Sequence, residues 1–201
     1  MTARKLVVTD RYVRSGRWPK EGEYPLANRA SGKRVGILGM GRIGKEIGKR
    51  AAAMNNTVAY HSRTPVADVS YKHYPDLVEL ARNSDFLIVI IPSTPQTLKI
   101  VNKAVIEALG PTGIFINVAR GAVVDEDALV EALKSGKLGG AGLDVFVNEP
   151  QVPEVLFGMD NVVLQPHVGS ATHETRRAMS QLVLDNLDAK FAGKSLLTEI
   201  K

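Results

Sequence analysis

The chain contains the pattern G-x-G-x-x-G from residue 39 to residue 44. Its first glycine ends a predicted buried strand at 33–39 (KRVGILG), and the pattern leads into a stretch at 42–54 with small residues on one helical face. In such a strand–turn–helix, the first glycine permits a tight turn, the second lets a pyrophosphate approach the backbone, and the third lets helix pack on strand. Phosphates then accept hydrogen bonds from free N–H groups at the helix N-terminus. We therefore predict a dinucleotide site that includes Gly39, Gly41, Arg42, Ile43 and Gly44.

The residues after the second predicted strand indicate which dinucleotide is favoured. A fold of this kind that uses NAD places Asp or Glu about 20 residues after the glycines, where it binds the ribose 2′-hydroxyl. Here the chain reads Ser62-Arg63-Thr64, with no acid before Asp68. An acid would repel a 2′-phosphate, whereas hydroxyls and a guanidinium donate hydrogen bonds to it. The sequence thus predicts NADP rather than NAD, with Ser62, Arg63 and Thr64 as ligands; the alternative is that Arg63 is a solvated loop charge.

Apolar runs and amphipathic stretches alternate from residue 33 onward, and they must position these loops. We predict strands at 33–39, 57–61, 85–91, 114–119, 140–146 and 161–165. We predict helices at 42–54, 75–82, 97–109, 125–138 and 172–192. This alternation is typical of right-handed βαβ units, and it predicts an α/β fold with a doubly wound parallel sheet.

The first 32 residues do not follow this alternation. Residues 6–13 (LVVTDRYV) fit either a short strand or part of an amphipathic helix. Residues 15–32 are rich in glycine, proline and polar groups, which predicts an extended arm or linker. We accordingly divide the chain into an N-terminal element with its arm (1–32), a dinucleotide-binding domain (33–170) and a C-terminal helix (171–201).

Composition and charge exclude several classes of protein. The chain has no cysteine, which excludes a disulfide scaffold, a zinc ribbon and thiol chemistry. Its longest apolar run, 86–91, is far shorter than the roughly 18–20 residues that a membrane helix needs. Asp10 interrupts the N-terminus too early for a signal peptide, so we expect a cytoplasmic protein with no membrane partner. The acids at 125–127 suit a helix start, so no metal site is predicted.

Basic residues are concentrated at the N-terminal end. Residues 1–50 hold 13 Lys and Arg against 4 Asp and Glu. Such a segment could meet nucleic acid, a membrane surface or a phosphorylated ligand, or it could be a solvated basic face. A nucleic-acid partner is disfavoured because the chain carries no nucleic-acid-binding motif.

Four further segments fall at or just beyond the predicted strand ends. They are 117–121 (NVARG), 142–146 (GLDVF), 148–150 (NEP) and 166–170 (PHVGS). In order and spacing, these segments and the glycine loop resemble the D-isomer-specific 2-hydroxyacid dehydrogenases. The likeness is strongest to the hydroxypyruvate/phenylpyruvate and glyoxylate reductase branch, which shows the same Ser-Arg-Thr strand end and GGAGLDVF stretch. It implies a Rossmann-type domain that uses NADP to reduce a small 2-oxo acid to the D-2-hydroxy acid.

The resemblance also implies a role for each matching residue. Arg120 matches the arginine that binds the substrate carboxylate and polarises the carbonyl group. His167 matches the proton donor, and Glu149 matches the acid that hydrogen-bonds this histidine. Asp144 matches an acid near the nicotinamide. The further residues implied to line the cofactor cleft are Pro92, Val118, Ala119, Arg120 and Gly169.

The chemistry of 2-oxo acid reduction agrees with these three catalytic residues. The reaction needs a hydride, which the cofactor supplies, together with a proton and an anchor for a carboxylate. Histidine carries a proton near neutral pH, a nearby carboxylate favours its charged form, and arginine binds a carboxylate in a planar fork. Plainer interpretations stay open: an ion pair of Arg120 with Asp125 or Glu126, an ordinary loop residue at Glu149, and a buried histidine at His167. The other histidines, expected to be structural or solvated, are His61, His73 and His173.

The resemblance further implies a substrate domain built from an N-terminal segment and the C-terminal helix. This chain lacks nearly all of that segment, so only remnants of the second domain are expected, either in a fragment or in a naturally short paralogue. The arm around Trp18 matches a dimer contact in relatives, with local packing as the alternative. Two other functions stay open: an NADP-binding, dimerising module without turnover, and a corepressor-like partner of nucleic acid.

Overall fold

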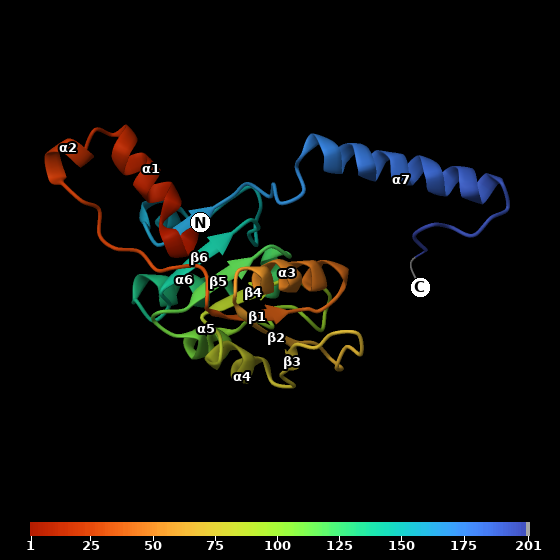
Figure 1. Cartoon of the computed structure of the whole chain (residues 1–201), viewed down its shortest axis with the longest axis horizontal. Helices are drawn as coiled ribbons and strands as arrows, with labels where there is room; N and C mark the ends of the chain where they lie inside the picture. Colours follow the sequence, from red (N-terminus) through yellow and green to blue (C-terminus); the bar gives the residue numbers. More distant parts are fainter. Residues whose placement is uncertain (200–201) are drawn as a thin grey trace. The chain divides into compact units, whose positions relative to one another are not determined.

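A computed structural model describes residues 1–199 (Figure 1). The chain divides into two compact units, the first being Met1–Pro166 and the second beginning at His167. The division at residues 32 and 170 that we drew from the sequence stays a prediction.

The first unit is built on a seven-stranded sheet with the order β3-β2-β1-β4-β5-β6-β7. Its strands are β1 (Arg34–Leu38), β2 (Thr57–His61), β3 (Lys72–His73), β4 (Phe86–Val89), β5 (Ile114–Asn117), β6 (Gly140–Leu143) and β7 (Val162–Leu164). All neighbouring strands run parallel. The predicted α/β fold with a doubly wound parallel sheet is therefore confirmed. The strand order reverses between β1 and β4, and sheets of this kind bind ligands at the carboxyl ends of the strands beside that reversal.

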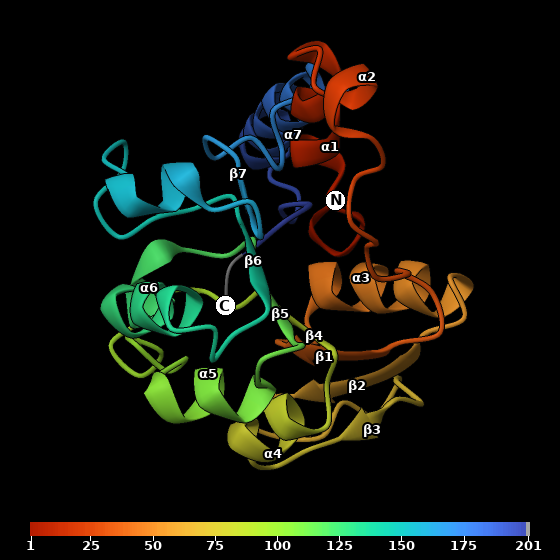
Figure 2. The same ribbon diagram turned by 90° about the vertical axis from the view of Figure 1, so that its left-hand side faces the viewer.

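Helices cover both faces of this sheet. Helix α3 (Arg42–Ala53) lies on one face, and α4 (Leu77–Arg82) and α5 (Lys103–Leu109) lie on the other (Figure 2). Helix α6 (Glu126–Lys134) contributes to the same apolar core as α4 and α5. Strand β4 faces both cores, since Leu87 and Val89 belong to the larger core while Phe86 and Ile88 pack against the smaller one.

The N-terminal segment is helical where the sequence left two possibilities. Residues Leu6–Arg14 form α1, which buries Val8 and Tyr12. The following arm is not extended throughout, because it contains the short helix α2 (Trp18–Glu21). The Tyr12 hydroxyl donates to the Gly22 carbonyl at 2.8 Å, and its ring lies edge-on to that of Tyr24. The arm therefore folds around Tyr12.

Helix α5 begins six residues later than predicted, so the expectation of a helix from residue 97 is wrong. Before the helix, the N–H groups of Lys99 and Val101 donate to the carbonyls of Ala122 and Val123. Asn102 then caps α5, because its side chain accepts from the Val105 N–H. Two residues before α5 thus pair with η2 (Gly121–Val123), a short 3-10 helix after β5, instead of continuing a helix from residue 97.

Three predicted strands end clearly earlier in the structure. They end at Val89, Asn117 and Leu143, two or three residues before the predicted ends. Beyond these points the chain leaves the sheet to form loops at its carboxyl edge. Strand β3 was not predicted, because its two residues, Lys72 and His73, carry no apolar run.

The second unit contains the helix α7 (His173–Phe191), close to the predicted range of 172–192. Thr172 caps it, since its hydroxyl oxygen accepts from the Thr175 N–H at 3.1 Å. Large apolar side chains of α7, such as Val183 and Phe191, are exposed. Within residues 1–199, no helix is both long and apolar enough to cross a bilayer.

An ion pair joins the amino ends of β1 and β4. Asp85 accepts from the Arg34 backbone N–H at 2.8 Å and from its guanidinium at 2.7 Å. The Arg34 hydrogen bond holds the pKa of Asp85 below its usual value. Because the folded pKa is lowered, this stabilisation is present above the ordinary aspartate pKa of about 4 and is lost as pH falls through the lower folded pKa.

We expect Asp85→Asn to lower the free energy of unfolding by about 1 kcal/mol at pH 7, the usual scale for a partly exposed charged pair. Denaturant titrations of both proteins at pH 7 and at pH 3 measure this difference. It should shrink at the lower pH, because pH 3 lies below the ordinary aspartate pKa of about 4, where protonation of the unfolded parent already removes part of the stabilisation. A constant difference at both pH values would contradict this assignment.

Candidate cofactor and active site

The loops that carry the predicted site residues of the first unit open at one edge of the sheet. They follow β1, β2, β4, β5 and β6, and parallel strands present their carboxyl ends together. Backbone hydrogen bonds join successive strand ends: Gly39 N–H to His61 C=O at 3.0 Å, Ile90 N–H to Leu38 C=O at 2.9 Å, Val118 N–H to Val89 C=O at 3.3 Å, and Asp144 N–H to Asn117 C=O at 3.1 Å.

Each glycine of the loop after β1 has its own reason to lack a side chain. Gly39 has φ +104°, a conformation that side chains rarely adopt. A Cβ on Gly44 would lie 2.0 Å from the Gly39 carbonyl oxygen, so this glycine lets α3 pack against the strand end. A Cβ on Gly41 would meet no protein atom within 4 Å, and Gly41 is exposed. The space beside Gly41 is therefore open to a ligand.

The N-terminus of α3 fits the pyrophosphate of a dinucleotide. Gly41 is the N-cap residue of this 12-residue helix, and no side chain caps it. The first N–H groups of a helix lack intrahelical partners and carry partial positive charge. Arg42 and Ile43, both exposed, stand in this first turn. The open space at Gly41 and the donors behind it form a cradle for an anion.

The turn after β2 is ordered by its own hydrogen bonds. The Ser62 hydroxyl donates to the Thr64 carbonyl at 2.7 Å. The side chain of Arg63 is exposed, and within residues 1–199 its guanidinium forms no ion pair. Arg63 is thus the cation of this turn that is available to an anionic ligand.

Asn117 shapes the loop that carries Arg120. It is 2% exposed, and its side chain accepts from the Ala119 N–H and donates to the Arg120 carbonyl, both at 3.0 Å. The Arg120 side chain is exposed, and its Nη1 donates to the Ala119 carbonyl at 2.6 Å. A rigid backbone therefore presents this guanidinium at the sheet edge, and the ion pairs with Asp125 or Glu126 do not form in the described part of the chain.

The loop that carries Glu149 lies directly against the loop that carries Arg120. A Cβ on Gly121 would lie 2.0 Å from the carbonyl carbon and oxygen of Phe146, so the two backbones are in contact there. The Glu149 carboxylate accepts from the Phe146 N–H at 3.0 Å. Glu126, at the start of α6, accepts from the Val147 N–H at 3.1 Å. The structure thus brings the loops of Arg120 and Glu149 together.

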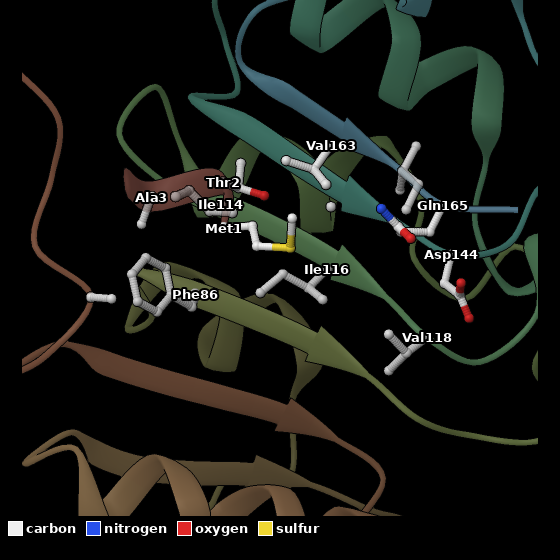
Figure 3. A pocket seen from close by; sticks show the side chains of 13 residues that line it. Met1, Thr2, Ala3, Phe86, Ile114, Ile116, Val118, Asp144, Val163 and Gln165 are labelled. Atoms are coloured by element: carbon white, nitrogen blue, oxygen red, sulfur yellow. The ribbon is translucent and has the colours of Figure 1, made fainter. Parts of the chain in front are cut away.

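An apolar hollow lies on the sheet face beside these loops. Figure 3 shows Phe86, Ile114 and Ile116 gathered along it. Val118 and Asp144 border its end, beyond the tips of β5 and β6 (Figure 3). Asp144 and Ala119 are buried, and Val118 is exposed. Pro92, which follows β4, is also exposed. These four residues, predicted to line the cofactor cleft, therefore all lie at the same edge.

His167 and Gly169 belong to the second unit. Both are exposed, and His167 has φ +55°. Only a few per cent of residues other than glycine adopt a positive φ, which makes His167 conformationally unusual. Its pairing with Glu149 remains a proposal.

Comparisons with known proteins test the resemblance read from the sequence. Residues 1–169 match the model of the family described as "D-isomer specific 2-hydroxyacid dehydrogenase, NAD binding domain". The chain belongs to this family. The resemblance stated from the sequence motifs is thereby confirmed.

Among other members of the 2-hydroxyacid dehydrogenase family, a glyoxylate/hydroxypyruvate reductase of Arabidopsis thaliana is 57% identical over 98% of this chain. A hydroxyphenylpyruvate reductase of Plectranthus scutellarioides is 54% identical over the same share. A crystal structure of an NADPH-dependent glyoxylate/hydroxypyruvate reductase from Sinorhizobium meliloti, in complex with NADP and malonate, matches 99% of this chain with a TM-score of 0.94 and 50% identity. The chain spans 63% of the length of each of these relatives.

Several positioning residues of this 2-hydroxyacid dehydrogenase domain were not singled out from the sequence. Asn117 and Gly121 were quoted only as parts of a motif, and Glu126 was considered only as an acid at a helix start and as a possible ion-pair partner of Arg120. A glycine placed directly after a strand-end arginine was a usable signal for close backbone approach at Gly121. The hydrogen bond from Val147 to Glu126 spans 21 residues, and no local pattern indicates it.

We expect Gly41→Ala to weaken NADPH binding about tenfold or more, because its methyl group would occupy the space that the pyrophosphate needs. Fluorescence titration with NADPH measures this loss. Stability should change by no more than about 1 kcal/mol, the usual scale of an N-cap substitution. Gly158→Ala is the matched control, because its Cβ also meets nothing within 4 Å and it lies far from α3 in the sequence. Equal NADPH affinity in both variants would contradict the assignment.

Proposed function

We propose that this chain is the cofactor-binding part of an NADPH-dependent reductase that converts a small 2-oxo acid, such as hydroxypyruvate or glyoxylate, to the D-2-hydroxy acid. One observation carries the proposal: the loops of Arg120 and Glu149 touch at Gly121, at the sheet edge where the glycine loop opens. The names of the Arabidopsis and Sinorhizobium relatives support this substrate class.

Different residues of the chain bind the cofactor and the substrate in this proposed reaction. When bound, NADPH supplies the hydride that reduces the carbonyl carbon. Gly41 and the N-terminus of α3 hold the pyrophosphate, and Arg63 with Thr64 holds the 2′-phosphate. Arg120 binds the carboxylate of the 2-oxo acid, which orients its carbonyl group.

A proton must reach the carbonyl oxygen as negative charge develops on it, and we assign this proton to His167. Glu149 would favour the protonated ring when the two side chains are paired, because a neighbouring carboxylate stabilises an imidazolium ion. Arg120 would stabilise the same developing charge. The remaining predicted cleft residues, Pro92, Val118, Ala119, Asp144 and Gly169, would border the nicotinamide.

We also propose that the N-terminal arm forms a homodimer contact. Trp18 is 56% exposed and Leu26 is 97% exposed, so more than half of each side chain is open to contact with a partner. Exposed tryptophan is a frequent anchor of protein interfaces. We place the protein in the cytoplasm, since a chain without cysteine shows no sign of adaptation to an oxidising compartment.

The decisive experiment measures oxidation of NADPH, with NADH in parallel, by the purified chain in the presence of hydroxypyruvate or glyoxylate. Turnover that favours NADPH supports the proposal. A folded chain that binds NADPH without turnover supports the second candidate, in which this chain is an NADP-binding dimerising module that does not itself reduce a 2-oxo acid. A folded chain that binds neither dinucleotide would overturn both.

A further inference from the structure

The turn that follows β2 is held at both ends by side chains from the sheet. Ser62 opens this turn and Val66 closes it, with Arg63 and Thr64 between them. We propose that His73 and Tyr60 are positioning residues that fix this turn for the 2′-phosphate of the dinucleotide. They would thereby set the preference for NADP over NAD, an inference that rests on the cofactor class proposed above.

His73 holds the first end of the turn. It lies on β3, directly opposite Tyr60 on β2, and the two rings are 5.2 Å apart. Its Nε2 lies 3.0 Å from the Ser62 carbonyl oxygen. A carbonyl oxygen only accepts hydrogen bonds, so the ring nitrogen must be the donor. This bond fixes the backbone of the residue immediately before Arg63.

Tyr60 holds the other end of the turn. Its side chain is 1% exposed and belongs to the apolar core under α3. Its hydroxyl oxygen accepts from the Val66 N–H at 2.8 Å. Because the ring is fixed in the core, the hydroxyl gives the turn a rigid point of attachment.

Inside the turn, the hydrogen bonds assign different tasks to the three predicted ligands. The single O–H of Ser62 is already donated to Thr64, so in this conformation Ser62 shapes the turn. Direct donation to a phosphate then falls to Arg63 and to the Thr64 hydroxyl. Asp68, the nearest following acid, pairs with Lys45 on α3, which partly neutralises its repulsion of a phosphate.

A turn held in this way binds phosphate with a smaller loss of conformational freedom than a mobile one. The effect is specific to the 2′-phosphate, because the pyrophosphate is held by the separate loop after β1. His73 and Tyr60 should therefore affect a ligand with a 2′-phosphate and leave a ligand without one unchanged.

The test uses adenosine 2′,5′-bisphosphate and adenosine 5′-phosphate as probes, with affinities measured by calorimetry on the full chain. Neither probe needs turnover. We expect His73→Phe to weaken binding of the bisphosphate about five- to tenfold, the scale of one hydrogen bond, with little change for the monophosphate. Phenylalanine keeps a flat ring against Tyr60 and removes only the donor. Tyr60→Phe should act in the same direction, because it removes the hydroxyl and keeps the ring.

Two further variants complete the design. His73→Gln places an amide N–H near the original Nε2 and should restore most of the bisphosphate affinity. Asn161→Leu is the matched control: it also removes a side-chain donor from a carbonyl, that of Gly139 at 3.2 Å, but at the amino ends of the strands. It should leave both affinities unchanged.

The outcomes separate this inference from the proposed function. The positioning role would be overturned if His73→Phe weakened the affinity for both probes equally. It would also be overturned if this variant melted like the parent and kept the parent's affinity for the bisphosphate. If His73→Phe does not fold, Tyr60→Phe decides in the same way. A parent chain that binds both probes equally would overturn the NADP assignment itself, and this inference with it.

Discussion

Arg120→Ala should lower kcat/KM for reduction of a 2-oxo acid by about 10²–10⁴-fold. The substitution removes both hydrogen bonds of a guanidinium fork to a carboxylate, and each such charged bond contributes about 1.5–3 kcal/mol. Truncation should have little effect on folding, because the Arg120 side chain is exposed and Asn117 bonds to the backbone of this loop. Steady-state kinetics with hydroxypyruvate, together with thermal unfolding, measures the two effects separately.

Lysine at the same position distinguishes charge from geometry. Arg120→Lys keeps a cation but loses the planar fork, so it should recover only part of the activity. Arg82→Ala is a suitable control, since Arg82 is also an exposed arginine but lies at the end of α4, before β4. If Arg120→Ala and Arg82→Ala both kept the parent's kcat/KM, Arg120 would not be the carboxylate ligand.

The fold could be predicted from the sequence because its signals are local. The apolar run around Leu87 and Val89 indicates a strand covered on both faces, and the spacing from Gly39 to Gly44 indicates a strand–turn–helix. Errors arose where distant residues decide the structure. The segment before α5 has helical periodicity, yet the N–H groups of Lys99 and Val101 pair with residues after β5.

The sequence proposes candidate site residues by type, but it does not indicate their contacts. Arg120 and Glu149 were identified through the motifs around them, whereas the contact between their loops depends on backbone packing at Gly121 that no spacing reveals. The same holds for His73, which carries no motif and was expected to be structural or solvated. Its bond to Ser62 becomes visible only when β3 is placed beside β2.

Gly121→Ala should impair both stability and activity. The added Cβ would lie 2.0 Å from two Phe146 backbone atoms and 2.4 Å from the Val147 nitrogen, and a backbone cannot yield as a flexible side chain does. Overpacking of this kind costs about 1–3 kcal/mol, and each kcal/mol lowers the Tm of a chain of this size by about 2–4 °C. Calorimetric melting of the variant and parent measures this loss.

The larger effect of Gly121→Ala should be on catalysis, because the clash separates the loops of Arg120 and Glu149. A displacement of about 1 Å at a reacting centre can lower a rate about 10²-fold, so kcat/KM should fall by that order even at temperatures where the variant is folded. Gly158→Ala is the control, since its Cβ meets nothing within 4 Å and both properties should be unchanged. A Gly121→Ala variant with lowered Tm but the parent's kcat/KM would mean that contact between these loops stabilises the fold without positioning the catalytic residues.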